Sequence, residues 1–316
     1  MRFLSPCRKY NLMRIAFSSV CSVLLLLSAA SYAAGQDDAD DDDVVIVDSS
    51  LVVLNVSVKD KTDKHVKGLK QQDFEILEDG VRQPITHFSV EDTPFAAVIL
   101  IDTSGSMENV IDMARAAAIR FLDGLRPDDN VAIYRFDSRV SLVQEFSNSR
   151  DVHPAIFDVR SYGNTSMYDA IYKAAGILSE RPEKRRAIIV LSDGADNQSG
   201  RSSDAALKAA MDVNASVYTI DMMGENARST QALMNRGILR KFADRSGGTF
   251  VSTPGGVRMR DALESIVEEL GVQYTLGYAP LNEKKAGKWR NIKLNVARPG
   301  LKVRTRKGYT ANKESR

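Results

Sequence analysis

The chain has 316 residues, of which 43% are hydrophobic and 27% charged, and its formal net charge is +2. This length suits one large domain or two ordinary ones, and the apolar fraction excludes a wholly disordered protein. Two cysteines and three histidines exclude a disulfide-dense scaffold and argue against a metal centre built from sulfur or imidazole. A net charge near zero argues against a protein dedicated to binding polyanions.

Residues 1–33 are typical of a secretory signal peptide. A basic start without acidic residues precedes an apolar run over residues 15–30, and Ser31-Tyr32-Ala33 offers small residues at the positions that signal peptidase reads. We predict cleavage after Ala33 and a secreted, periplasmic or cell-envelope protein. The apolar run approaches the length of a membrane span, so an uncleaved signal anchor is the alternative.

Residues 34–43 follow as an acidic segment with six aspartates between Asp37 and Asp43. These charges repel one another and leave nothing to bury, which predicts a disordered linker. A calcium-binding tract is the alternative, although the turn glycine and the ligand spacing of a calcium loop are missing.

Residues 44–92 have a β pattern. Leu54, Val56 and Val58 alternate with polar residues, as in a half-buried strand. Asp79-Gly80 lies between two apolar stretches, and this dipeptide is a strong signal for a hairpin turn. We predict an N-terminal β segment here.

Between residues 93 and 271 buried strands alternate with amphipathic helices. Residues 96–101 are continuously apolar, as in a strand covered on both faces. Apolar residues then recur every three or four positions up to Leu125, which is the helical period. The alternation predicts a doubly wound, mostly parallel α/β sheet of Rossmann-like type. Further helices are expected near residues 167–178, 205–213, 238–245 and 259–270.

Residues 272–310 return to a β pattern, and residues 311–316 form a tail. Neither β segment is large enough for a core of its own. We therefore predict that residues 272–310 pack with residues 44–92 as one small β domain, into which the α/β domain is inserted. Within the α/β domain, the strands 131–136 and 140–146 are joined by three residues, so they must be antiparallel and lie at a sheet edge.

The C-terminal end is basic, with ten Lys or Arg and one acidic residue from Lys288 onward. Lys302, Arg304 and Arg306 share one face of a predicted strand. The interpretation is a solvated strand face that discourages edge pairing. An anionic partner is the alternative.

Three short segments carry oxygen-bearing side chains next to the predicted strands and helices. They are Asp102-Thr103-Ser104-Gly105-Ser106 after the first buried strand, Gly163-Asn164-Thr165-Ser166 before a helix, and Ser192-Asp193-Gly194 after a later strand. In open α/β sheets ligands bind beyond the carboxyl ends of the strands. Carboxylates and hydroxyls suit a hard cation such as Mg²⁺, and two carboxylates balance its charge.

This constellation resembles the metal-ion-dependent adhesion site (MIDAS) of von Willebrand factor A domains, and the resemblance covers roughly residues 94–270. It implies that Ser104 and Ser106 bind Mg²⁺ (or Mn²⁺ or Ca²⁺) directly, and Thr165 directly or through water. Asp102 and Asp193 would act largely through waters, or would lie close behind the direct ligands and anchor them. An acidic residue of a partner protein would complete the coordination sphere.

Two positions depart from the family pattern without removing a ligand oxygen. Asn164 stands where glycine is frequent, which bears on how the threonine loop moves, and Ser192 stands where threonine is common. The flanking β segments, with Tyr274-x-Leu276-Gly277-Tyr278 and Arg306-Lys307-Gly308-Tyr309, resemble those of secreted bacterial proteins of the Acidobacteria with related domains.

The resulting hypothesis is an exported, non-enzymatic module that captures a protein carboxylate through the bound cation. One alternative is a metal-assisted hydrolase with Asp102 or Asp193 as base; another is a structural component of an envelope or surface assembly. Because the sequence has neither a G-x-S-x-G elbow nor a nucleotide-binding glycine motif, we assign no catalytic residue. We expect no nucleic-acid partner and no membrane span in the mature form, and the oligomeric state stays open.

Overall fold

The computed structural model describes residues 51–90, 93–151, 153–161, 163–224, 228–253, 255–281 and 287–311. The predicted signal peptide, the acidic linker and, apart from Ala311, the C-terminal tail lie outside the described residues. In the part of the chain that is described, no helix is long and apolar enough to cross a membrane.

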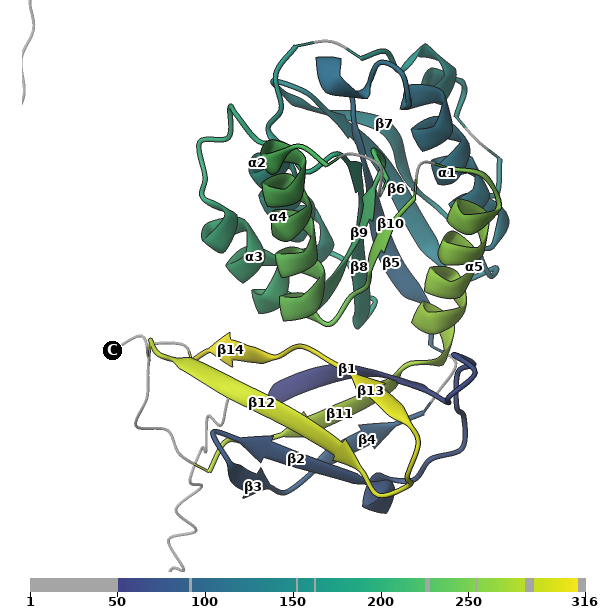
Figure 1. Cartoon of the computed structure of the whole chain (residues 1–316). Coiled ribbons are helices and arrows are strands. Elements are labelled where there is room, and N and C mark those ends of the chain that lie inside the picture. Colours follow the sequence, from purple (N-terminus) through teal and green to yellow (C-terminus); the bar gives the residue numbers. More distant parts are fainter. Residues whose placement is uncertain are drawn as a thin grey trace, which may run out of the picture. The chain divides into compact units, whose positions relative to one another are not determined.

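A six-stranded, mostly parallel sheet organises the α/β part of the chain (Figure 1). Its order is β10-β9-β8-β5-β6-β7, and only the β6–β7 pair is antiparallel. The strands are β5 (Phe95–Asp102), β6 (Asn130–Phe136), β7 (Val140–Ser147), β8 (Arg185–Ser192), β9 (Ala215–Asp221) and β10 (Phe250–Ser252). The predicted fold class is therefore confirmed, and the short connection does produce an antiparallel pair at one edge.

Helices cover both faces of this sheet (Figure 1). They are α1 (Ile111–Asp123) and α5 (Gly256–Val272) on one face, and α2 (Met167–Ser179), α3 (Ser203–Asp212) and α4 (Thr230–Ser246) on the other. The central position of β5, with helices on both faces, explains why its sequence is continuously apolar. Ile99 packs in the core under α1 and α5, whereas its neighbours Val98 and Leu100 pack in the core under α2, α3 and α4, because successive side chains point to opposite faces.

Strands from before and after the α/β part pair with one another in two antiparallel sheets. One has the order β13-β1-β11-β4, with β1 (Val52–Lys59), β4 (His87–Ser89), β11 (Tyr274–Tyr278) and β13 (Lys302–Arg304). The other has the order β14-β12-β2-β3, with β2 (Phe74–Glu78), β3 (Val81–Gln83), β12 (Trp289–Val296) and β14 (Gly308–Thr310). Both contribute to one apolar core. Asp48–Arg316 forms a single compact unit. This unit is not divided at 92/93 or at 271/272, so the predicted domain boundaries there stay predictions.

The Asp79-Gly80 dipeptide forms the predicted hairpin between β2 and β3. Asp79 has φ +49° and Gly80 φ +86°. Positive φ at both central residues is the geometry that a two-residue hairpin turn requires.

The prediction of a solvated basic strand face is wrong for two of its three residues. Arg304 forms an ion pair with Glu269 of α5, whose side chain is 2% exposed, and donates from Nε to the Gly247 carbonyl at 3.1 Å. Arg306 is buried, and its Nη1 donates to the Met211 carbonyl at 3.3 Å. The reason is tertiary: this end of the chain runs along the α/β part instead of facing water. Lys302 is exposed as expected.

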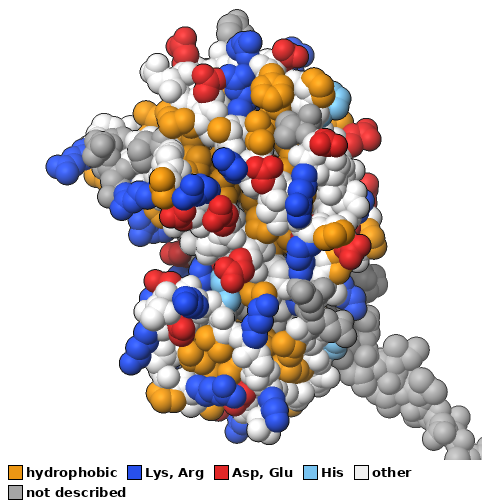
Figure 2. All heavy atoms as spheres, turned by 90° about the vertical axis from the view of Figure 1, so that its right-hand side faces the viewer, with side chains coloured by type: hydrophobic (Ala, Val, Ile, Leu, Met, Phe, Trp, Pro, Cys, Tyr) orange, Lys and Arg blue, Asp and Glu red, His pale blue; other side chains and the backbone are white. Residues whose placement is uncertain are grey.

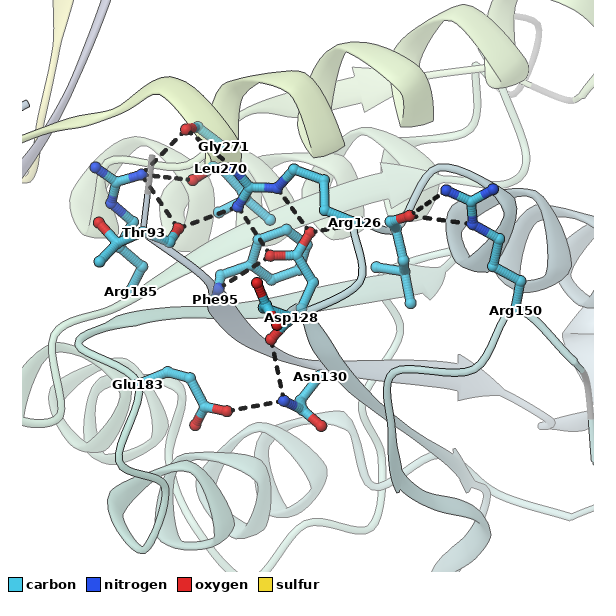
Figure 3. Close-up of polar contacts among 12 residues, drawn as sticks. Thr93, Phe95, Arg126, Asp128, Asn130, Arg150, Glu183, Arg185, Leu270 and Gly271 are labelled. Atoms are coloured by element: carbon cyan, nitrogen blue, oxygen red, sulfur yellow. Dashed lines mark hydrogen bonds and ion pairs between the residues drawn. The ribbon is translucent and has the colours of Figure 1, made fainter. Parts of the chain in front are cut away.

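Two arginines fasten the start of the central sheet to the end of α5 (Figure 3). Arg185, the first residue of β8, is buried and donates from Nη1 to the carbonyls of Leu270 and Gly271 at 3.3 and 3.2 Å. The Nη2 of Arg126 donates to the Thr93 carbonyl at 3.0 Å. The last carbonyls of a helix have no partner within it, so a buried guanidinium at this place both satisfies them and complements the negative end of the helix dipole.

Candidate metal centre

The first loop of the predicted site follows β5. Asp102, the last residue of that strand, is fully buried. Its Oδ1 accepts from the Ser104 amide at 2.9 Å, and its Oδ2 accepts from the Ser192 hydroxyl at 2.5 Å. A 3-10 turn over Gly105–Met107 follows, and the Ser104 and Ser106 hydroxyl oxygens lie 3.1 Å apart. The alternate side chains of this turn thus point to a common place.

The environment of Asp102 disfavours the charged form of its carboxyl group. Burial raises the pKa of this carboxyl to about 7; the hydrogen bonds from Ser192 and Ser104 oppose the rise, and the charge of Asp193 adds to it. Desolvation disfavours the charged form of any buried acid. A cation held nearby would favour the carboxylate.

The third loop follows β8 and is linked to the first through Ser192. The Ser192 hydroxyl accepts from the Gly194 amide at 2.9 Å while it donates to Asp102. Gly194 has φ +81°, and a β-carbon there would lie 2.6 Å from the Asn235 carbonyl oxygen of α4. Only glycine therefore lets the chain turn here. Asp193, between them, is half-buried and accepts from the Ala195 amide at 2.9 Å.

The second loop, residues 163–166, lies between the other two and is bonded to both. The Gly163 carbonyl accepts from the Gly105 amide of the first loop at 3.1 Å. The Thr165 amide donates to Oδ1 of Asn197, in the third loop, at 2.9 Å. Thr165 itself is almost fully buried. The structure therefore brings all three predicted segments together at the carboxyl ends of β5 and β8.

Sequence reasoning missed two residues of this arrangement. Ser192 belongs to one of the three predicted segments but is not among the predicted site residues, yet its hydroxyl links Asp102 to the third loop. Its position at the end of a buried strand was the available signal. Asn197 gave no signal, because its partner Thr165 lies 32 residues away.

The donor set suits a hard divalent cation. The five predicted residues offer two carboxylates and three hydroxyls, and oxygen ligands are what Mg²⁺ and Ca²⁺ prefer. Ser106 is exposed, so the cluster can be reached from solvent. Among the residues that the structure describes, no group of three or more His, Cys, Asp or Glu side chains could hold a metal ion. The candidate site is of a different kind, because it has two carboxylates and its other ligands are hydroxyls.

Residues 97–195, which include all five predicted site residues, match the family model of the von Willebrand factor type A domain. The chain therefore contains a domain of this family. A relative from Synechocystis sp. (strain ATCC 27184 / PCC 6803 / Kazusa), the uncharacterized protein sll0103, is 26% identical over 134 residues. That match covers 40% of this chain and 32% of the relative, so the chain spans about a third of its length.

Solved structures with similar folds include three bacterial proteins. BatB from Bacteroides thetaiotaomicron is 19% identical, with 56% of this chain and 98% of that chain covered and a TM-score of 0.47. The vWF domain of the type V pili tip protein Mfa5 from Porphyromonas gingivalis is 15% identical, with coverages of 57% and 97% and a TM-score of 0.48. The pilus adhesin SpaC from Lactobacillus rhamnosus GG is 12% identical, with coverages of 80% and 49% and a TM-score of 0.48.

Proposed function

We propose that this protein is an exported interaction module that binds a divalent cation and, through it, an acidic side chain of a partner protein. The observation that carries the proposal is the hydrogen-bonded assembly of three loops holding Asp102, Ser104, Ser106, Thr165 and Asp193. The cation is Mg²⁺, with Mn²⁺ or Ca²⁺ as substitutes. Export rests on the predicted signal peptide, which directs the protein to the periplasm, the cell envelope or the medium.

Each residue has a distinct part in this proposal. The hydroxyls of Ser104, Ser106 and Thr165 would hold the cation, while Asp102 and Asp193 would contribute negative charge largely through waters. Neutral hydroxyl ligands leave a bound cation electrophilic, and it then offers a coordination position to an external carboxylate. Because Ser106 is exposed, a partner could approach from that side.

The geometry favours binding over hydrolysis. A hydrolase would need Asp102 or Asp193 as a general base. Both carboxylate oxygens of Asp102 accept hydrogen bonds from within the protein, and Asp193 accepts one from the Ala195 amide. These bonds occupy the carboxylate oxygens and hold them in place, which suits charge balance beside a cation better than proton transfer.

A protein partner also suits the surface better than a nucleic acid. Figure 2 shows Lys and Arg mixed with Asp and Glu on the face formed by α1 and α5. A nucleic-acid interface concentrates basic residues instead. The buried ion pair of Arg304 removes one of the basic residues that could have formed such a patch near the C-terminus.

Calorimetric titration with Mg²⁺ tests the proposal. We expect binding by the wild type and its loss in Asp102→Ala and in Ser106→Ala. Ser179→Ala is the matched control, because its exposed hydroxyl bonds only the Gly176 carbonyl at the end of α2. Mg²⁺ affinity that is unchanged in Asp102→Ala would contradict the proposal, since residual binding would then belong to another place such as the acidic segment 37–43.

Partner capture separates an interaction module from a structural metal site. We expect envelope proteins to bind the immobilised wild type in Mg²⁺ but not in EDTA, and not to bind Asp102→Ala in either. If EDTA lowers the melting temperature while capture is the same in both buffers, the cation only stabilises the fold.

A further inference from the structure

The threonine loop is held from one side by two neighbouring residues of the third loop, Asn197 and Gln198, which we call the brace. The Thr165 amide donates to the Asn197 side-chain oxygen at 2.9 Å. The Thr165 carbonyl accepts from the backbone amides of Asn197 and Gln198 at 3.1 and 3.0 Å. Both backbone polar groups of Thr165 are thus occupied by the brace.

Further hydrogen bonds hold the other residues of the threonine loop. The Asn164 amide donates to the Ser138 hydroxyl at 3.3 Å, and the Ser166 amide donates to the Asp137 carbonyl at 2.9 Å. The Asn164 side chain donates to Oε1 of Gln198 at 2.7 Å. A glycine, frequent at this position in the family, could not make that last bond. The departure at Asn164 therefore ties the loop more firmly to the brace.

The brace is itself anchored to the helix that follows the threonine loop. Asp196 accepts from the Tyr168 amide at 2.8 Å, and the Ser199 hydroxyl accepts from the Asp169 amide at 3.1 Å. The first amides of a helix lack partners within it, so these bonds fix residues 196–199 against the first turn of α2. Asn197 thus holds Thr165 from a rigid support.

We propose that Asn197 is a positioning residue that fixes the threonine loop, so that the Thr165 hydroxyl is in place before a cation arrives. The proposal rests on the cation site proposed above and goes beyond it, because it makes the site preassembled. Partners that orient metal ligands are worth about 10–100-fold in affinity. A site that needs no loop movement avoids the cost of ordering the loop on binding.

Two measurements test the proposal, and one of them needs no cation. In cation-free protein, we expect Asn197→Ala to speed hydrogen exchange of the Thr165 amide, whereas Asn197→Asp, which keeps the accepting oxygen, retains protection. In Mg²⁺ titrations, we expect Asn197→Ala to bind at least about tenfold more weakly and Asn197→Asp to bind like the wild type or more tightly. Asn148→Ala is the matched control, because its exposed side-chain amide donates to the Pro127 carbonyl at 2.8 Å, away from the three loops.

The outcomes separate this proposal from the one on which it rests. Unchanged exchange at Thr165 in Asn197→Ala overturns the positioning role whatever the cation does. Equal Mg²⁺ affinity of the wild type and Asn197→Ala overturns the role as well, while the cation site stands. A wild type that does not bind Mg²⁺ overturns the proposed function and the positioning role with it. The Asn197 side chain is exposed, so the variants should fold, and their melting temperatures verify this.

Discussion

The ion pair between Arg304 and Glu269 is the sharpest test of how the C-terminal strands are held against the α/β part. Glu269 is 2% exposed and Arg304 is 30% exposed at the side chain. Glu269 also accepts from the Tyr218 hydroxyl at 2.7 Å. Arg304→Met keeps much of the apolar stem but leaves Glu269 buried without a cation.

The structure sets the size of the expected loss. Removing one partner of a buried pair costs about 3–5 kcal/mol, because the other charge stays desolvated. Partial exposure of Arg304 lets water replace some of the interaction, and the Tyr218 hydroxyl bond remains, so we expect about 3 kcal/mol. For a protein of this size that corresponds to roughly 6–12 °C in melting temperature. Glu269→Gln added to Arg304→Met should restore about 1–2 kcal/mol, because it removes the uncompensated charge.

Urea unfolding followed by the fluorescence of Trp289, the only tryptophan, measures these differences. Lys302→Met is the matched control: it removes a charge from the same strand, but its ion pair with Asp63 is 66% and 69% exposed, so it should cost less than about 1 kcal/mol. A loss below about 1 kcal/mol in Arg304→Met, or no recovery in the double variant, would show that the buried Glu269 does not depend on Arg304.

Two further predictions concern the backbone and pH. Gly194→Ala should lower the free energy of unfolding by about 2–4 kcal/mol, since it combines positive φ with a contact of 2.6 Å to the Asn235 carbonyl oxygen. Gly80→Ala, with φ +86° and open space around it, should cost only about 1–2 kcal/mol in the same urea titration; equal losses would show that crowding at Gly194 is unimportant. Burial and the charge of Lys59 lower the pKa of His65 below its usual value. The folded state therefore binds this proton less readily than the unfolded state, and stability should fall as pH drops through about 6.5. His65→Gln should have a shallower decline between about pH 7 and pH 5 than the wild type, and identical slopes would refute the assignment.

Local periodicity was enough to predict most of the fold. The apolar run of β5, the antiparallel pair β6–β7 and the turn at Asp79-Gly80 all depend on residues close in sequence. The helix predicted near residues 238–245 instead begins at Thr230, after Ser229, whose hydroxyl accepts from the Ala232 amide at 3.1 Å. Serine is a preferred N-cap, so the first residue of α4 could have been predicted from the sequence.

Burial of the basic C-terminal residues could not be predicted in this way. The pattern Lys302, Arg304, Arg306 looks like a solvated strand face, and only its position against the α/β part pairs Arg304 with Glu269 and buries Arg306. The burial of Arg185 has the same origin, because its partners Leu270 and Gly271 lie 85 and 86 residues away.

The residues of the candidate site could be predicted from the sequence because they lie at or after strand ends, where parallel topology brings loops together. Asp102 ends β5 and Asp193 directly follows β8, and these two strands are adjacent in the sheet. The hydrogen bonds that join their loops, through Ser192 and Asn197, depend on exact backbone positions. Residue type and spacing do not determine such positions.

Paramagnetic line broadening by Mn²⁺ is the decisive measurement for the proposed cation site, because it reports where the cation binds. With substoichiometric Mn²⁺, we expect the amide signals of residues 102–106, 163–166 and 193–198 to broaden first and to recover when Mg²⁺ is added in excess. Asp102→Ala should abolish this local effect. Broadening confined to residues 37–43, or equal broadening of the three loops in Asp102→Ala, would contradict a cation site at the carboxyl ends of β5 and β8.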